Sequence, residues 1–112
     1  METVEEKRGG VKVVGLCGRL DATTCPDVEK RLLTLVDEGE VRIAIDFSGL
    51  SYISSAGLRL LMLVAKRVQA SGGRLALAAL NDNVHEIFKI SGLTQLFYMY
   101  QTVDEAATYC AG

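Results

Sequence analysis

The sequence predicts an α/β fold, with a small mixed, mostly parallel sheet of four to five strands and helices mainly on one face. Apolar segments of strand length alternate with segments of helical periodicity, and short turns join them. Such alternation is typical of parallel strands joined by right-handed crossovers. The run 41–47 is mostly apolar with little alternation, which indicates a strand covered on both faces.

Two strands and a helix are expected first. A strand over 11–16 follows a shorter one near 3–7, and the glycine pair between them turns a hairpin that would add an antiparallel edge. After a loop over 18–24, Pro26 fits the first turn of a helix, where its missing N–H costs nothing. Gly39 ends this helix. Its apolar stripe consists of Val28, Leu32, Leu35 and Val36.

The second half of the chain continues the alternation. The expected elements after the strand at 41–47 are a helix over 55–71, a strand over 74–79, a helix over 81–91 and a strand over 96–100. The face of the long helix that should pack on the sheet consists of Leu58, Leu61, Ala65 and Val68. Thr102 and Glu105 have the spacing of a capping box and start a last helix that reaches about Cys110.

Size and charge limit the class of protein. The 112 residues suit a single domain over 1–112, and a hydrophobic fraction of 49% supplies a core. A net charge of −2 with scattered basic residues argues against nucleic-acid binding. The longest apolar runs are too short to cross a bilayer, and no signal peptide is recognised, so we expect a soluble protein without direct membrane insertion.

Metal and catalytic chemistry are not expected. The three cysteines, which should pack as small hydrophobic residues, are Cys17, Cys25 and Cys110. Their odd number, without a CxxC pattern, favours reduced thiols and the cytoplasm. His85 has no nearby Cys or second His, which argues against zinc. Asp21 and Asp46 lack an accompanying His, Lys or metal-ligand set, so we predict no catalytic residue and no cofactor.

The most informative segment covers 45–61. A buried strand leads into a short polar loop, and then into a helix that opens on Ser54 and Ser55. Hydroxyls there lie where a helix points its free N–H groups, and a phosphate added there would be held by those groups. Serine is also a favoured helix cap. Both interpretations stay open from the residues alone, and they are compatible because capping geometry also presents the hydroxyl.

Five short motifs in order resemble those of the STAS domain family, named for sulfate transporters and anti-sigma factor antagonists. They are Gly18-Arg19-Leu20-Asp21, Asp46-Phe47-Ser48-Gly49, Tyr52-Ile53-Ser54-Ser55-Ala56-Gly57-Leu58, the helix end at 86–93, and Glu105-Ala106-Ala107. The resemblance covers almost the whole chain and implies the STAS fold. In bacterial antagonists of that family, one serine at this helix start is phosphorylated.

The resemblance assigns roles at the helix start. Ser55 falls on the phosphoacceptor, and Gly57 follows it in the Ser-Ser-Ala-Gly-Leu form of the motif. Ser54 stands where many antagonists carry Asp, and Ala56 where many carry a second Ser. The missing Asp would have placed a negative charge beside the hydroxyl, so its absence bears on kinase or phosphatase preference.

We expect a partner surface around Ser55. Arg59 and Leu63 share the helix face opposite the sheet, with Met62 at the boundary. Asp21, Asp46 and Ser48 are the further candidates. The two carboxylates either bind N–H groups in turns or lie near Ser55, since open α/β sheets gather functional loops at the carboxyl ends of their strands.

The resemblance implies an anti-sigma factor antagonist. Unphosphorylated, such a protein binds an anti-sigma factor with a serine-kinase fold; the kinase phosphorylates it and the complex separates, and a metal-dependent serine phosphatase resets it. Two alternatives stay open within the family. One is a cytoplasmic subunit that braces the ATPase of a lipid-transport ABC system, and the other is a scaffold subunit of a stress-signalling assembly.

Overall fold

Five strands form one mixed sheet. They span Glu2–Arg8 (β1), Val11–Leu20 (β2), Arg42–Ile53 (β3), Arg74–Ala78 (β4) and Tyr98–Tyr100 (β5). The computed structural model describes every residue from 1 to 112 and places the strands in the order β1-β2-β3-β4-β5. β1 runs antiparallel to β2, and all other neighbours are parallel. The predicted mostly parallel sheet with an antiparallel edge hairpin is confirmed.

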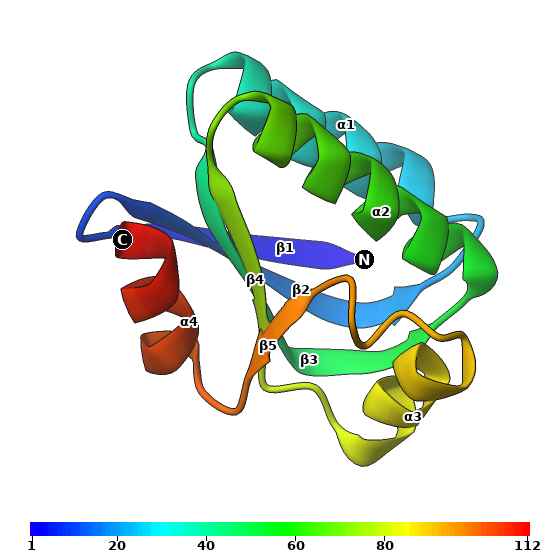
Figure 1. Ribbon diagram of the computed structural model, residues 1–112. Coiled ribbons are helices and arrows are strands. Elements are labelled where there is room, and N and C mark those ends of the chain that lie inside the picture. The colour runs from blue at the N-terminus through cyan, green and yellow to red at the C-terminus, as the bar shows by residue number, and fades with distance from the viewer.

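Three of the four helices cover one face of the sheet, and the fourth covers the other (Figure 1). The helices span Cys25–Asp37 (α1), Ser55–Ala70 (α2), Asp82–Ile90 (α3) and Val103–Ala111 (α4). α1 and α2 lie side by side, and α3 sets Phe88 edge-on against Phe47 of β3. α4 packs alone on the opposite face. The prediction that the helices lie mainly on one face is confirmed.

Local sequence explains the helix boundaries. Pro26 occupies the first turn of α1, and Gly39 follows its end with a φ of 94°, a left-handed conformation that suits glycine. At the start of α4, the Thr102 hydroxyl accepts from the Glu105 N–H at 3.1 Å, and the Glu105 carboxylate accepts from the Thr102 N–H at 3.2 Å. The predicted glycine stop and capping box are therefore both present.

The two faces of the sheet are packed with side chains of different size. The face under α1, α2 and α3 buries large aliphatic and aromatic residues in the main core. The face under α4 is built from small residues, namely Val11, Val13, Ala44, Ala76 and Ala78 on the sheet with Ala106, Ala107 and Cys110 on the helix. Small side chains let α4 approach the strands closely. Two arginines also hold its end, because Arg42 and Arg74 donate to the carbonyls of Cys110 and Tyr109 at 2.7 and 2.9 Å.

The second and third strands are longer than the sequence predicted. Residues 18–20 and 48–53, interpreted as loop, are strand in the structure. β2 and β3 stay paired past the end of β4, with register shifts between Gly15 and Cys17 and between Gly18 and Arg19. The outer side of this extension is polar because no helix covers it, while Leu20, Leu50 and Ile53 point inward and are buried. The polarity that indicated a loop belongs to the solvent side of a twisted ribbon.

Two further observations concern chemistry and membranes. All three cysteines are free thiols, and burial raises the pKa of Cys110 to about 11. Cys25 and Cys110 are buried as small hydrophobic residues, as predicted, whereas Cys17 is half-buried. No helix of the structure combines the length and the apolar character required to cross a membrane.

Candidate functional site

The ends of β2 and β3 bring two loops together. The Ser54 N–H donates to the Leu20 carbonyl oxygen at 2.9 Å, which ties the start of α2 to the start of the loop before α1. Leu20 and Ile53, the last residues of the two strands, are both buried beneath this junction. Asp21, which follows Leu20, and Ser55, the first residue of α2, therefore lie at the same end of the sheet.

Ser54 is the cap of α2. Its backbone is extended, with φ −96° and ψ 174°, and its hydroxyl accepts from the Gly57 N–H at 3.3 Å. This geometry satisfies one of the free donors of the first turn. Of the two serines, Ser54 is therefore the one with a structural role. Its side chain is partly buried and points back toward the first turn of the helix.

Ser55 is the first residue of α2, and its side chain is exposed. The first turn of the helix contains no acidic residue. The remaining free N–H groups and the helix dipole at this end favour negative charge. A phosphate on Ser55 would thus meet a favourable electrostatic environment without competition from a neighbouring carboxylate on the helix.

Gly57 is required by close packing. A Cβ at this position would lie 2.7 Å from Cγ1 of Ile53 and 3.1 Å from the carbonyl oxygen of Leu20. Real Cβ atoms essentially never lie as close as 2.7 Å to another side chain, so a larger residue would force the first turn of α2 or Ile53 to shift. The glycine of the motif thus holds Ser55 at the junction of the two loops.

Asp21 organises the loop before α1. Its carboxylate accepts from the Thr23 hydroxyl at 2.8 Å, and from the N–H groups of Thr23 and Thr24 at 3.0 and 3.2 Å. The hydrogen bond from the Thr23 hydroxyl, followed by those from the backbone, holds the pKa of Asp21 below its ordinary value. Asp21 is therefore a turn carboxylate, and it also lies on the loop next to Ser55. The two interpretations left open by the sequence both apply to it.

Asp46 does not stand at the end of its strand, contrary to expectation. It lies in register with Gly15 and Ala78 in the middle of the sheet, because β3 continues to Ile53. Its carboxylate accepts from the N–H of Ser48 at 2.9 Å, a local role of the turn kind. The structure thus brings Asp21, but not Asp46 and Ser48, to the loops around Ser55.

On α2, the side chains of Arg59 and Leu63 are exposed, Leu63 at 39%, and Met62 is half-buried. The predicted polar side of the helix is therefore correct. The buried side is wider than predicted, because Leu60 and Val64 are also buried in the main core. α2 rests on α1 as well as on the sheet, so two sides of the helix are covered.

Sequence reasoning missed a pair on the outer side of the β2–β3 ribbon. The guanidinium of Arg19 lies 4.2 Å from the ring centroid of Tyr52, and both side chains are exposed. The Ser51 hydroxyl donates to the Gly18 carbonyl at 3.0 Å and holds the two strands together there. The only indication in the sequence was that Arg19 and Tyr52 both belong to motifs that resemble those of the STAS family. Their contact depends on a register shift that the sequence does not reveal.

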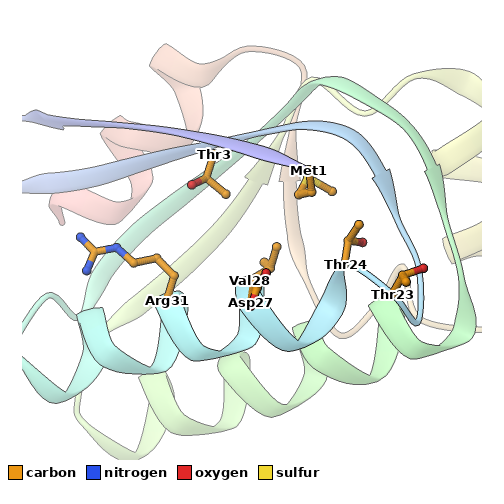
Figure 2. A pocket seen from close by; sticks show the side chains of 7 residues that line it. All are labelled: Met1, Thr3, Thr23, Thr24, Asp27, Val28 and Arg31. Atoms are coloured by element: carbon orange, nitrogen blue, oxygen red, sulfur yellow. The ribbon is translucent and has the colours of Figure 1, made fainter.

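A separate hollow lies between β1 and α1 (Figure 2). It has a volume of about 350 Å³ and is lined by Met1, Thr3, Thr23, Thr24, Asp27, Val28 and Arg31. Arg31 is already engaged, because its Nε and Nη2 donate to the Glu5 carboxylate at 2.6 and 2.7 Å. The hollow contains no cluster of free charged groups that converge on a ligand. The exposed hydroxyl of Ser55 is the better candidate for function.

Known proteins resemble the chain over nearly its full length. The family model for the STAS domain matches residues 3–106. BtrV of Bordetella bronchiseptica, which is named as an anti-sigma factor antagonist, is 36% identical to this chain over 107 residues. The match covers 96% of this chain and 92% of BtrV.

Solved structures agree. An anti-sigma factor antagonist from Mycobacterium paratuberculosis has a TM-score of 0.90 and 26% identity, covering 99% of this chain and 94% of the other. The Bacillus cell fate determinant SpoIIAA in its phosphorylated form has a TM-score of 0.75 and 25% identity, with coverage of 96% and 98%. The resemblance and the fold expected from the short motifs are confirmed.

Proposed function

The chain belongs to the STAS domain family, and within this family we propose that it acts as an anti-sigma factor antagonist whose switch is Ser55. The observation that carries the proposal is that the two serines at the start of α2 are placed differently. Ser54 caps the helix, while Ser55 stays exposed on a first turn without acidic residues. Similarity to antagonists over nearly the whole chain supports the same function.

In the proposed mechanism, the unphosphorylated protein binds an anti-sigma factor with a serine-kinase fold and thereby frees a sigma factor. The partner surface is the exposed side of α2, with Ser55, Arg59, Met62 and Leu63. A half-exposed leucine beside a cation provides an apolar contact with a charged rim, as protein interfaces commonly have. We add Asp21 and the Arg19–Tyr52 pair to this surface, because the Leu20 carbonyl between Arg19 and Asp21 accepts from the Ser54 N–H at the helix start.

Phosphorylation by the bound kinase, with ATP, ends the complex. The phosphate adds a charge of about −1.5 to −2 and three acceptor oxygens. The helix start accommodates it, so we expect the fold to stay unchanged. In a fitted interface, however, an unpaired buried charge costs several kcal/mol. A loss of about 3 kcal/mol weakens binding more than a hundredfold.

A metal-dependent serine phosphatase resets the switch by removing the phosphate. The chain is the substrate of both enzymes and contributes no catalytic group of its own. We place this exchange in the cytoplasm, the compartment that supplies ATP. Ser54, where many antagonists carry Asp, leaves the acceptor without a neighbouring carboxylate, so preference among kinases or phosphatases is expected to depend on this position.

Partner capture from the native host tests the proposal. Immobilised wild type, Ser55→Asp and Gln69→Glu are exposed to lysate, and the retained proteins are identified by mass spectrometry. Gln69→Glu is the matched control, because it adds one negative charge to an exposed position near the other end of the same helix. We expect a protein with a serine-kinase fold to bind wild type and the control, and to be lost with Ser55→Asp.

Incubation of the captured kinase with ATP should then phosphorylate wild type and leave Ser55→Ala unmodified. Equal retention of the kinase-fold protein by wild type and Ser55→Asp would contradict the switch. A transporter ATPase retained equally by all three variants would instead support the lipid-transport alternative, with Ser55 as a plain part of the helix start.

A further inference from the structure

The exposed side of α2 carries only positive charges. The helix contains no acidic residue, and its three cations are Arg59, Lys66 and Arg67. Arg67 is paired, because its guanidinium lies 3.3 Å from the Asp37 carboxylate of α1. Arg59 and Lys66 are exposed, and neither forms an ion pair within the chain. Both therefore remain free cations on the solvent side of the helix.

Arg59 lies about one turn along the helix from Ser55. Residues four apart are neighbours on a helix surface, with about 5–6 Å between their Cβ atoms. Both side chains are exposed, so neither is held by packing in the core. At this spacing an anion is best placed N-terminal to a cation, which is the order that a phosphate on Ser55 and the Arg59 guanidinium would have. A guanidinium can also give a phosphate two parallel N–H bonds.

The elements packed against this end of α2 leave Arg59 without a carboxylate. Asp21, on the loop before α1, is bonded within its own turn, and its carboxylate lies 3.9 Å from the guanidinium of Arg19. The charged side chains in the first two turns of α1 are two acids and two bases, namely Asp27, Glu29, Lys30 and Arg31. Their charges cancel, and none of them pairs with Arg59.

We propose that Arg59 is the internal counter-ion of the phosphorylated switch, and that a phosphate on Ser55 pairs with it inside the same chain. The inference rests on the proposed phosphorylation of Ser55. In the unphosphorylated protein the Arg59 guanidinium is free to donate to a carboxylate of the partner. After phosphorylation it donates to the phosphate instead. One modification therefore adds a negative charge to the interface and also withdraws a positive charge from it.

Phosphoserine placed at position 55 during synthesis tests this pair without a kinase or a partner. Three proteins that carry the phosphate are compared: the otherwise wild-type chain, Arg59→Gln and Lys66→Gln. Lys66→Gln is the matched control, because it removes the same charge from the same side of the helix, about 16 Å from Ser55 along the axis. That separation exceeds the screening length of about 8 Å at physiological salt. Both substituted side chains are exposed, so circular dichroism should be unchanged.

Phosphorus NMR titration measures the second pKa of the phosphate, which is about 6 in phosphoserine. A neighbouring cation stabilises the doubly charged form and lowers this pKa. Arg59→Gln should therefore raise the pKa by about 0.3 unit relative to the wild-type chain. Lys66→Gln should leave it unchanged. The helix start, Asp21 and the charges of α1 act equally in all three proteins, so the difference reports Arg59 alone.

The Arg59 side chain reports the same event from the other side of the pair. Its Nε–H signal should shift as the phosphate ionises, whereas the signal of Arg67, which is held by Asp37, should stay fixed. An equal pKa in the wild-type chain and Arg59→Gln would overturn the inference. An equal rise in Lys66→Gln, or an Arg59 signal that does not respond to the phosphate, would do the same.

The outcome is separate from that of partner capture. If no kinase-fold protein is captured, the proposed function fails, but the pKa difference between the wild-type chain and Arg59→Gln would still establish the pair. If capture succeeds and the pKa values are equal, the switch stands and acts through the phosphate charge alone, without Arg59.

Discussion

α2 and α4 both begin with a hydroxyl cap, yet their first turns have opposite electrostatics. Ser54 caps α2 without any acidic residue in the first turn, whereas the cap of α4, Thr102, is followed by Asp104 and Glu105. A phosphate at the start of α2 would meet free N–H groups, but at the start of α4 it would meet two carboxylates. The cap decides where a helix begins, and the next three residues decide whether an added anion is accepted.

The third helical position shows the same contrast in packing. Glu105 of α4 is exposed and reaches back to the cap, while Gly57 of α2 is buried against Leu20 and Ile53. The start of α2 is thus pressed against a second loop, whereas the start of α4 is open to solvent. A change at Gly57 therefore disturbs buried neighbours, whereas a change at Glu105 affects an exposed side chain whose partner is the helix cap.

The largest expected effect therefore comes from Gly57→Val. The new side chain would clash with Ile53 and with the Leu20 carbonyl, and overpacking of this kind costs about 2 kcal/mol or more. Glu105→Val at the matched position of α4 should cost no more than about 1 kcal/mol, since it removes only half of a capping box. Urea denaturation measures both losses of stability. Equal losses would mean that close packing does not make the start of α2 more sensitive to substitution than the start of α4.

The helix caps Ser54 and Thr102 should contribute similar amounts to the free energy of unfolding. Ser54→Ala and Thr102→Ala each remove a side-chain acceptor from a first turn and should lower the free energy of unfolding by about 1 kcal/mol. Ser54→Asp keeps an acceptor at the position and should be close to neutral. A Ser54→Ala variant as stable as wild type would mean that Ser54 is not the structural member of the serine pair.

A charge at Ser55 should give a smaller effect of opposite sign. Ser55→Asp places a carboxylate beside the free N–H groups of α2 and should raise the free energy of unfolding by about 0.3–1 kcal/mol at low salt. Ser55→Asn, which has nearly the same shape without the charge, is the control. The gain should shrink in high salt. A destabilised Ser55→Asp would contradict the expectation that phosphorylation leaves the fold intact.

Local rules in the sequence were sufficient for the helix starts and for the order of elements. The capping box at Thr102 and the glycine stop at Gly39 both depend on residues within one turn of each other. The same is true of the alternation that indicates parallel strands. Such signals survive folding because the chemistry that produces them is local.

Features that depend on distant contacts were missed or misplaced. The expected loop after Phe47 is strand because β2 pairs with it, and this moves Asp46 away from a strand end. The Arg19–Tyr52 contact needs the register shift between those strands. The extra buried side of α2, with Leu60 and Val64, needs α1 beside it. None of these partners is within a turn in sequence.

The smallest expected effect concerns the third helix start in this region, that of α1. No side chain caps this helix at Thr24, and Asp21 instead accepts hydrogen bonds in the loop before it, which hold its pKa below the ordinary value of 3.8. Because the pKa of Asp21 is lower in the folded state, its ionised carboxylate stabilises the fold at pH values above 3.8. This stabilisation is lost as the pH falls through the folded-state pKa. The stability difference between wild type and Asp21→Asn should therefore narrow below pH 3.8.

The same carboxylate also reports on the switch. The bond between the Ser54 N–H and the Leu20 carbonyl places the loop of Asp21 beside the start of α2, so a negative charge on Ser55 should raise the pKa of Asp21 toward its ordinary value. Carboxyl-detected NMR titration of wild type, Ser55→Asn and Ser55→Asp measures this, and only the aspartate variant should show the rise. An unchanged pKa would mean that a phosphate acts through α2 alone and that Asp21 contributes to the partner surface only by its shape.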